Sequence, residues 1–159
     1  MDVILLKING VNGNCTITGH ANEIILNSYQ HGVSLPMSMD PGNTERTAGR
    51  PAFSEFVFSK MTDQSTPTLY ASCASGKKLG DAIIEIGRNE NGNFMSLMKY
   101  TLTNSMVSNI STGGGGGMPS DSFSLNYTKI KTQFTQQNPD SSEKGKADFG
   151  WDLEANKAA

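Results

Sequence analysis

The sequence of 159 residues is poor in the residue types that build most active sites. It has two histidines, two cysteines and one tryptophan, and only 18% of its residues are charged. Two cysteines are too few for a disulfide framework in a chain of this length. His20 and His31 are the only histidines, and no pair of Cys or His residues has the spacing of metal ligands. The sequence therefore indicates no metal centre, no cofactor and a reducing folding compartment.

An excess of positive charge and long hydrophobic runs are also missing. The formal net charge is −2, and Lys and Arg are not clustered as nucleic-acid binding requires. No apolar run approaches the ~20 residues that cross a bilayer. The first residues, MDVILLKING, lack the basic start and the small-residue cleavage site of a signal peptide. We therefore expect no nucleic-acid partner, no membrane insertion and no signal-peptide export.

Five consecutive glycines, Gly113–Gly117, are the most unusual local feature. A phosphate-binding P-loop would place Gly-Lys-Ser/Thr after such a loop and lead from a strand into a helix. Here the glycines lead into Met118-Pro119 and then into a predicted strand. The glycines therefore predict a flexible hairpin connection, which has room to lie flat against a neighbouring subunit.

Alternating apolar and polar residues predict six or seven strands. The predicted strands cover residues 3–8, 23–34, 53–58, 82–88, 98–110 and 123–134. Within 98–110 one face has Tyr100, Leu102, Met106 and Ile110, and the other has Lys99, Thr101, Thr103 and Ser105. After the glycines, Phe123, Leu125 and Tyr127 share a face, whereas Ile130 and Phe134 take the opposite phase. A bulge, or burial of both faces, would explain that switch.

One helix is predicted between these strands. Thr66 suits its N-cap, Pro67 its first position, and Gly76 its C-terminal end. Its apolar stripe consists of Leu69, Tyr70 and Cys73. Many strands with hairpin connections and one helix predict a mainly-β fold, an antiparallel β-barrel or two-sheet barrel with one flanking α-helix. We expect a single domain over residues 1–159.

Two stretches lack strand periodicity. Residues 35–50 carry prolines and glycines without a repeat, which predicts a long loop, and long ordered loops are often functional. Residues 136–146 are polar, but apolar residues return in DFGWDL. We therefore expect residues 136–159 to form a C-terminal tail that docks on the domain.

An enzyme is the least favoured class. Cys73 is the only plausible nucleophile, and its place on the apolar stripe favours a buried small side chain instead. There is no Gly-x-Ser-x-Gly motif and no obvious carboxylate pair, and Asp63 and Asp81 lie where carboxylates cap or meet solvent. A small-ligand-binding β-barrel with an apolar pocket in its mouth stays open as an alternative.

Polar uncharged strand faces are more suggestive. Ser28 and Gln30 share one face of a predicted strand, and Thr101, Thr103 and Ser105 share another. In an isolated domain such faces simply meet water. In an assembly they pair between subunits or line a wetted channel.

Four motifs resemble one known family in the correct order along the chain. They are DQSTPTLYASCASGKKL (63–79), VSNISTGGGGG (107–117), SFSLNYTKI (122–130) and FGWDLEANKAA (149–159). Together they resemble the haemolysin-coregulated protein (Hcp) family, whose members form the tube of the bacterial type VI secretion system. The resemblance extends over nearly the whole chain.

The resemblance implies a structural protein, not an enzyme. Copies would close into a homohexameric ring, and rings would stack into a tube inside a contractile sheath. Contraction expels the tube with its tip (spike) from the bacterial cytoplasm to the outside, without a signal peptide. Effector proteins are held in the lumen of such a tube.

The resemblance also assigns residues. The protruding loop 35–50 would stack rings through Pro36, Met37, Ser38, Asp40, Asn43, Glu45, Arg46 and Arg50. The lumen, and hence effector cargo, would meet Ser28 and Gln30, with His31 standing where the family has an aromatic residue. The flexible inter-subunit loop would consist of Gly113, Gly114, Gly115, Gly116 and Gly117.

Overall fold

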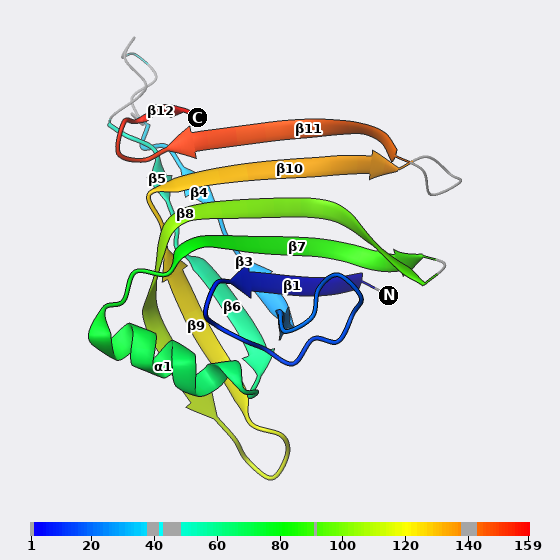
Figure 1. Cartoon of the computed structure of the whole chain (residues 1–159). Coiled ribbons are helices and arrows are strands. Elements are labelled where there is room, and N and C mark those ends of the chain that lie inside the picture. The colour runs from blue at the N-terminus through cyan, green and yellow to red at the C-terminus, as the bar shows by residue number, and fades with distance from the viewer. Residues whose placement is uncertain (1, 38–41, 43–48, 91, 138–142) are drawn as a thin grey trace.

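The computed structural model describes residues 2–37, 42, 49–90, 92–137 and 143–159. It contains twelve strands and one helix among these residues (Figure 1). The elements are β1 Asp2–Ile8, β2 Ile24–Leu26, β3 Ser28–Gln30, β4 Val33–Ser34, β5 Ala52–Phe53, β6 Phe56–Met61, α1 Ser65–Ser75, β7 Gly80–Glu90, β8 Asn93–Gly113, β9 Ser120–Asn126, β10 Lys129–Gln137, β11 Glu143–Asp152 and β12 Lys157–Ala158. The predicted mainly-β fold with one helix is confirmed.

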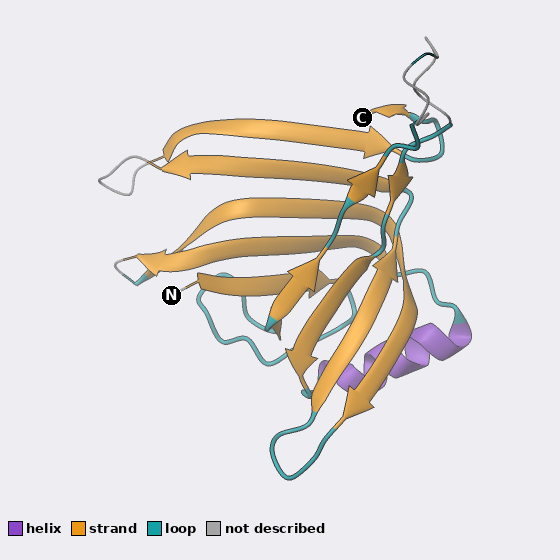
Figure 2. Ribbon diagram, turned by 180° about the vertical axis from the view of Figure 1, so that it is seen from behind, coloured by secondary structure: helices purple, strands orange, loops and turns teal. Residues whose placement is uncertain are grey.

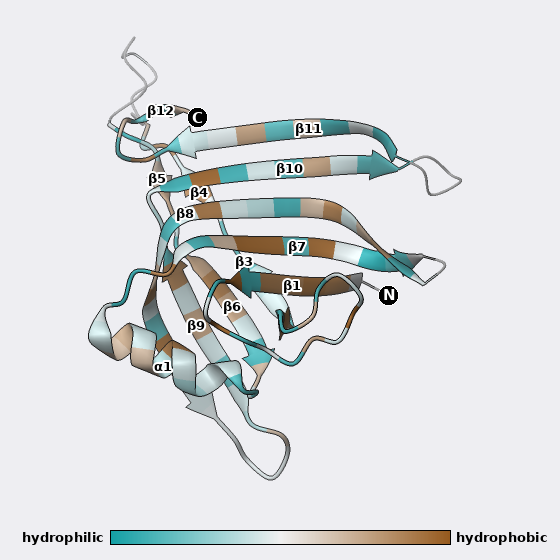
Figure 3. Ribbon diagram, viewed as in Figure 1, coloured by the Kyte–Doolittle hydropathy of each residue, from teal (hydrophilic) through white to brown (hydrophobic). Residues whose placement is uncertain are grey.

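A large antiparallel sheet has the strand order β12-β11-β10-β8-β7-β1-β2. Alternate residues of its central strands point inward, so Leu6, Ile84 and Leu102 are fully buried. Figure 3 shows the hydrophobic colour concentrated on β1 and β7, toward the β2 end of this sheet. β7 and β8 pair antiparallel up to Glu90↔Asn93, as the two strands of a hairpin do.

A smaller sheet has the strand order β3-β6-β9-β8, in which only the last part of β8 takes part. Its inward residues include Phe56, Phe58, Phe123 and Leu125, which have at most 1% of their surface exposed. The two sheets meet at an angle (Figure 2), and their inward faces share one hydrophobic core. Phe56 and Phe58 therefore lie on the same inward face of β6.

Strand β8 belongs to both sheets because it changes direction at Asn104. Asn104 has a left-handed φ of 56°, and a register shift follows between Val107 and Asn109. The left-handed residue interrupts the period of two, so Ser105 is buried although the sequence predicted it outward. Met106 is likewise not on the face predicted for it, whereas Ile110 returns inward after the shift.

The predicted strand 23–34 is broken into β2, β3 and β4. β2 pairs with β1 in the large sheet, and β3 pairs with β6 in the small sheet. Between them the backbone N–H of Asn27 donates to Ser59 O at 2.7 Å. The chain therefore passes from one sheet to the other here, as it also does in β8, and these two passages hold the sheets around the core.

Helix α1 packs against β8 and lies beside the small sheet (Figures 1 and 2). The predicted N-cap at Thr66 is wrong: Gln64 occupies the cap, and Thr66 and Pro67 are the second and third helical residues. Tyr70 is 42% exposed, so the predicted apolar stripe is also wrong there, and Ser65 and Ser72 are buried instead. Gly76 ends the helix with a φ of 65°, as predicted.

The expected C-terminal tail is mostly a strand. β11 pairs with β10 from Lys129↔Asp152 to Gln137↔Glu143, and β12 folds back onto β11. Gly150 has no side chain to obstruct this return, since a Cβ there would lie 2.8 Å from Ala159 O. The described residues 143–159 thus dock by extending the large sheet. Over the described part of the chain, no helix has the length and apolar character needed to span a bilayer.

Candidate functional site: the neutral face of the small sheet

The outer face of the small sheet is built almost entirely from small uncharged side chains. The register places Ser28, Ser59, Ser122 and Ser111 in one row across four strands. Gln30, Val57, Ser124 and Asn109 form the next row, and Met61, Ser120 and Gly113 form a third. We call these eleven positions the serine face. The prediction that Ser28 and Gln30 share one face of a strand is confirmed, and both residues are exposed.

No position of the serine face carries a charge. A carboxylate first occurs at its margin, where Glu55 accepts a hydrogen bond from Ser108 Oγ. Lys60 and Asp121 lie in the same strands but belong to the alternate positions, so they point through the sheet to the other side. The outer face is therefore uncharged. The inner face is apolar at Phe58 and Phe123 and carries the charged pair Lys60 and Asp121 at the next inward positions.

The ionic part of the inner face is a fully buried pair. Lys60 Nζ lies 2.7 Å from Asp121 Oδ2 and 3.0 Å from Asp63 Oδ1, and it donates to Thr66 Oγ1 at 2.9 Å. The side chains of Lys60 and Asp121 have no exposed surface. A buried charge is tolerated only when it is paired and hydrogen-bonded, and this lysine has three acceptors.

Asp121 is the centre of the same network. Besides Lys60, its carboxylate accepts from Thr66 at 2.5 Å, Thr112 at 2.7 Å and Thr62 at 3.0 Å. Burial alone would raise the pKa of Asp121, but these four donors outweigh it and lower the pKa to about 2. The carboxylate is thus charged in the folded protein at neutral pH.

This network fixes the helix relative to the serine face. It joins β6, β8 and β9 to the first turn of α1. Three residues of the network are sequence neighbours of serine-face residues, namely Lys60, Asp121 and Thr112, so their side chains point to the opposite side of the sheet. Helix α1 and the serine face therefore lie on opposite sides of the small sheet.

His31 follows Gln30 at the edge of this region. Its ring stacks on Phe56 with centroids 4.3 Å apart, and its Nε2 lies 2.6 Å from Tyr127 Oη. Tyr127 donates its own proton to Ser54 O at 2.8 Å, so the His31 Nε2–H must be the donor to Tyr127. Burial lowers the pKa of His31 and, with Glu55 adding repulsion, raises the pKa of Tyr127. The neutral imidazole is the form that packs here.

The loop 35–50 is described at its two ends. Pro36 and Met37 are exposed, and Arg50 Nη2 donates to Leu153 O at 3.1 Å. Val33–Ser34 and Ala52–Phe53 pair as a short ladder at the base of the loop. The predicted stacking residues Ser38, Asp40, Asn43, Glu45 and Arg46 lie outside the described residues.

The glycine segment is a hairpin connection between β8 and β9, as predicted. Gly113 still pairs with Ser120, and Gly116 is the one glycine of the five with a left-handed φ, at 84°. A Cβ at Gly113, Gly115 or Gly117 would meet no other atom within 4 Å. Most of these glycines are therefore not required by packing within one subunit.

The remaining candidates do not assemble into a reactive site. Cys73 is half-buried and packs against the core, and His20 pairs with Glu23 at 2.6 Å. Over the described ranges, no group of three or more His, Cys, Asp or Glu side chains converges as metal ligands. Sequence reasoning missed the Lys60–Asp121 pair and the complete serine face, because each is assembled across several strands.

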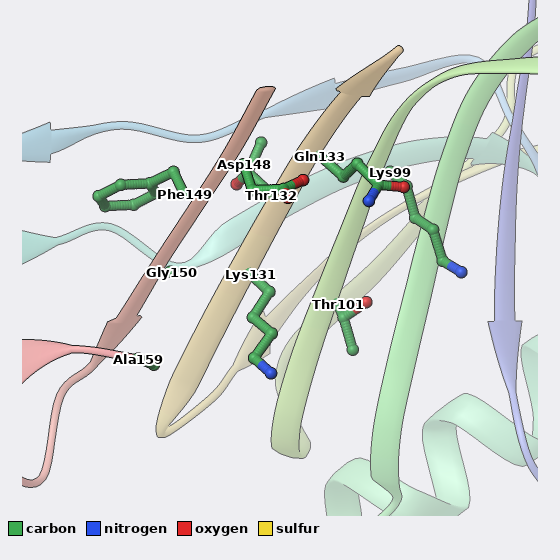
Figure 4. Close-up of a pocket in the computed structure, with 9 residues that line it drawn as sticks. All are labelled: Lys99, Thr101, Lys131, Thr132, Gln133, Asp148, Phe149, Gly150 and Ala159. Carbon is green, nitrogen blue, oxygen red and sulfur yellow. The ribbon is translucent and has the colours of Figure 1, made fainter. Parts of the chain in front are cut away.

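A pocket of about 420 Å³ lies on the outer face of the large sheet (Figure 4). Figure 4 shows that its walls come from neighbouring strands, with Lys99, Lys131 and Gln133 projecting from β8 and β10. Asp148 and Phe149 of β11 complete one side. This lining is mostly polar and charged, unlike the apolar pocket that a ligand-carrying barrel requires.

Comparison with known proteins gives the chain a family. The family model described as "Type VI secretion system effector, Hcp" matches residues 5–134. The chain belongs to the Hcp family. The resemblance seen in the four sequence motifs is therefore confirmed, and Hcp proteins are components of the type VI secretion system, not a family of enzymes.

Individual Hcp proteins are similar in sequence and in fold. Protein hcp1 of Pseudomonas aeruginosa is 31% identical over 108 residues, which cover 66% of this chain and 67% of that protein. The Hcp1 structure from Salmonella typhimurium has a TM-score of 0.82 and 25% identity, with 99% of each chain covered. A structure described as a type six secretion system protein has a TM-score of 0.92 over the full length of both chains, at 21% identity.

Proposed function

We propose that this chain is the tube-forming component of a type VI secretion system. Copies would close into a homohexameric ring, and rings would stack into the expelled inner tube. The observation that carries this proposal is the neutral serine face on the side of the small sheet opposite α1, in a chain of the Hcp family. In a ring this face is suited to line the lumen while α1 faces outward.

Ring closure needs one interface repeated around the axis, made from two different surfaces of each copy. The small sheet has two such surfaces, since among the described strands β3 pairs only with β6 and residues 109–113 of β8 pair only with β9. Joining the β3 edge of one copy to the β8 edge of the next would continue the sheet around the ring. The adjoining loop Gly113–Gly117 would adapt to the neighbour.

Stacking between rings is assigned to the loop 35–50. Its residues Pro36, Met37, Ser38, Asp40, Asn43, Glu45, Arg46 and Arg50 would meet the next ring. The charged and polar residues among them favour a contact weaker than ring closure, which a sheath or tip protein would template. The hydrogen bond from Arg50 to Leu153 anchors one end of the loop to the body of the chain.

Effector proteins would occupy the lumen, next to Ser28 and Gln30. The further partners are the sheath and tip proteins of the machine, and the route is from the bacterial cytoplasm to the outside through the system itself. No cofactor takes part in this function, because assembly and expulsion need surfaces and no bond is made or broken.

The proposal is tested by the mass of the purified protein in solution. Sedimentation should give six times the subunit mass of 17.0 kDa, and negative-stain images should show rings with a central hole. A protein that stays monomeric at high concentration would overturn the ring, and with it the tube.

A further inference from the structure

The serine face differs sharply from the outer face of the large sheet. Across the large sheet one row contains Glu85, Lys99, Gln133 and Asp148. The three rows of the serine face contain six serines, one asparagine and one glutamine and no charged residue. Both faces belong to one chain and both meet solvent in the single copy, so exposure to water alone does not account for the difference.

We propose that the serine face selects its partner by the absence of charge. It holds a polypeptide surface that is polar but carries few charges, through hydrogen bonds, and the strength of binding is nearly independent of salt. This inference rests on the proposed function, in which the face lines the lumen and the partner is an effector protein.

Electrostatics excludes the charged alternatives. A charged side chain that packs against this face loses hydration and finds no countercharge in any of the three rows. The nearest ion pair, Lys60–Asp121, is directed to the other side of the sheet and has no exposed surface. A partner rich in Lys, Arg, Asp or Glu at its contact surface therefore binds more weakly than a neutral one.

Hydrogen bonding favours a neutral polar partner. Each serine hydroxyl donates one hydrogen bond and accepts two, so the row Ser28, Ser59, Ser122 and Ser111 accommodates backbone or side-chain groups of either kind. Serine is short and loses little rotamer freedom on binding. Val57 and Met61, which are 38% and 39% exposed, add neutral apolar contact. Around a ring each subunit repeats the same positions, so weak contacts add up.

Three fluorescent peptides provide the test on the full chain. The neutral peptide consists of Ser, Asn, Gln and Gly. The acidic peptide has Glu at every second position, and the basic peptide has Lys at the same positions. Fluorescence anisotropy should give the neutral peptide a Kd at least about tenfold below that of either charged peptide. Between about 50 and 500 mM NaCl that Kd should change less than about twofold.

Variants locate the binding. Ser122→Lys adds a charge to the central row, and Thr101→Lys adds the same charge to the outer face of the large sheet. Ser122→Lys should raise the Kd of the neutral peptide. It should also lower the Kd of the Glu-containing peptide at least about tenfold relative to the unsubstituted chain at low salt, and this gain should be lost at high salt. Thr101→Lys, which lies outside the serine face, should leave the Kd of the neutral peptide unchanged.

The outcomes separate this inference from the proposed function. Rings that bind no peptide, or that bind a charged peptide as tightly as the neutral one, overturn the inference and leave the ring intact. A monomer overturns the proposed function, while the peptide series still decides the preference of the face, which exists in one copy.

Discussion

At the scale of single residues, the stability of the fold depends on the buried ion pair between Lys60 and Asp121. Both side chains are fully buried, and each satisfies the charge of the other at 2.7 Å. Removing one partner leaves an uncompensated charge in a dry environment, which is far more costly than losing a surface ion pair. Both residues also form hydrogen bonds to Thr66 in the first turn of α1, so losing the pair would loosen the helix as well as the sheet.

We expect Lys60→Met to destabilise the protein by about 3–5 kcal/mol at neutral pH. Urea unfolding at pH 7 measures this loss. The double variant Lys60→Met with Asp121→Asn should recover a large part of it, because the amide removes the unpaired charge. A double variant that is less stable than the single one would contradict this explanation.

The same pair predicts a reversal of pH dependence. In the wild type the Asp121 pKa is about 2 when folded and near 3.8 when unfolded, so its contribution is complete above about pH 4 and is lost as the pH falls toward 2. In Lys60→Met the buried carboxyl prefers its protonated form. That variant should therefore gain stability, relative to the wild type, as the pH falls from 7 toward 4.

His31 predicts a separate pH effect. Burial lowers its pKa in the folded state from 6.5, so below that value the unfolded chain binds a proton that the folded chain excludes. Stability should fall as the pH decreases through 6.5. In His31→Phe, which preserves stacking on Phe56, this part of the slope should be missing. Unfolding midpoints of both proteins at pH 7.5 and pH 5.5 give the comparison, and equal slopes would exclude His31 as the cause.

Among the elements, the glycine hairpin contains more glycines than the backbone and packing of one subunit require. Gly116 has a left-handed φ of 84°, whereas a Cβ at Gly115 would meet no other atom. Gly116→Ala should cost about 1 kcal/mol of folding stability, and Gly115→Ala should be neutral or stabilise by up to about 0.5 kcal/mol. Thermal unfolding of the two variants measures both values.

If Gly115→Ala folds normally but assembles poorly, the open space at this position serves the neighbouring subunit and not the hairpin. Equal losses of stability in both variants would show instead that the whole segment is constrained within one chain.

The loop 35–50 is the element assigned to stacking. Deleting residues 38–48 should leave the fold and the rings intact, because the strands β4 and β5 at its base remain paired and Arg50 stays in place. Secretion should be abolished. The solution mass of the deletion variant controls for ring formation, and normal secretion by that variant would refute the stacking role.

At the scale of the whole molecule, the small sheet is the part of the chain that the proposed ring would use for closure. Its two ends differ, its outer face is neutral and its inner face is closed by the core and α1. A head-to-tail contact between the different ends generates a ring when the rotation from one copy to the next closes. The large sheet extends away from the small sheet at an angle to it (Figures 1 and 2).

Ser28→Cys with Ser111→Cys tests that contact, in a Cys73→Ala background. A short bismaleimide should link neighbouring copies into a ladder that ends at six, since the two cysteines lie on opposite edges of the small sheet. Either cysteine alone should give no ladder. Rings that form without cross-linking would show that closure uses other surfaces.

The sequence by itself determined the helix, most of the strands and the family, but β11 was expected only as a docking tail. Alternation with a period of two located the strands and the inward faces of Phe56, Phe58, Phe123 and Leu125, and Gly76 marked the end of the helix. The four ordered motifs pointed to Hcp. These features are local, because they depend on neighbours two to four residues apart and on single residues that end an element.

The tertiary structure alone decided the serine face, the Lys60–Asp121 pair and the change of sheet in β8. The same alternation places Lys60 with Phe58 and Asp121 with Phe123, so a signal for two inward charges was present in the sequence. It did not say that they meet, because contact across 61 positions depends on the register between β6 and β9. That register is fixed by how the two strands pack around the core, which no short window of sequence contains.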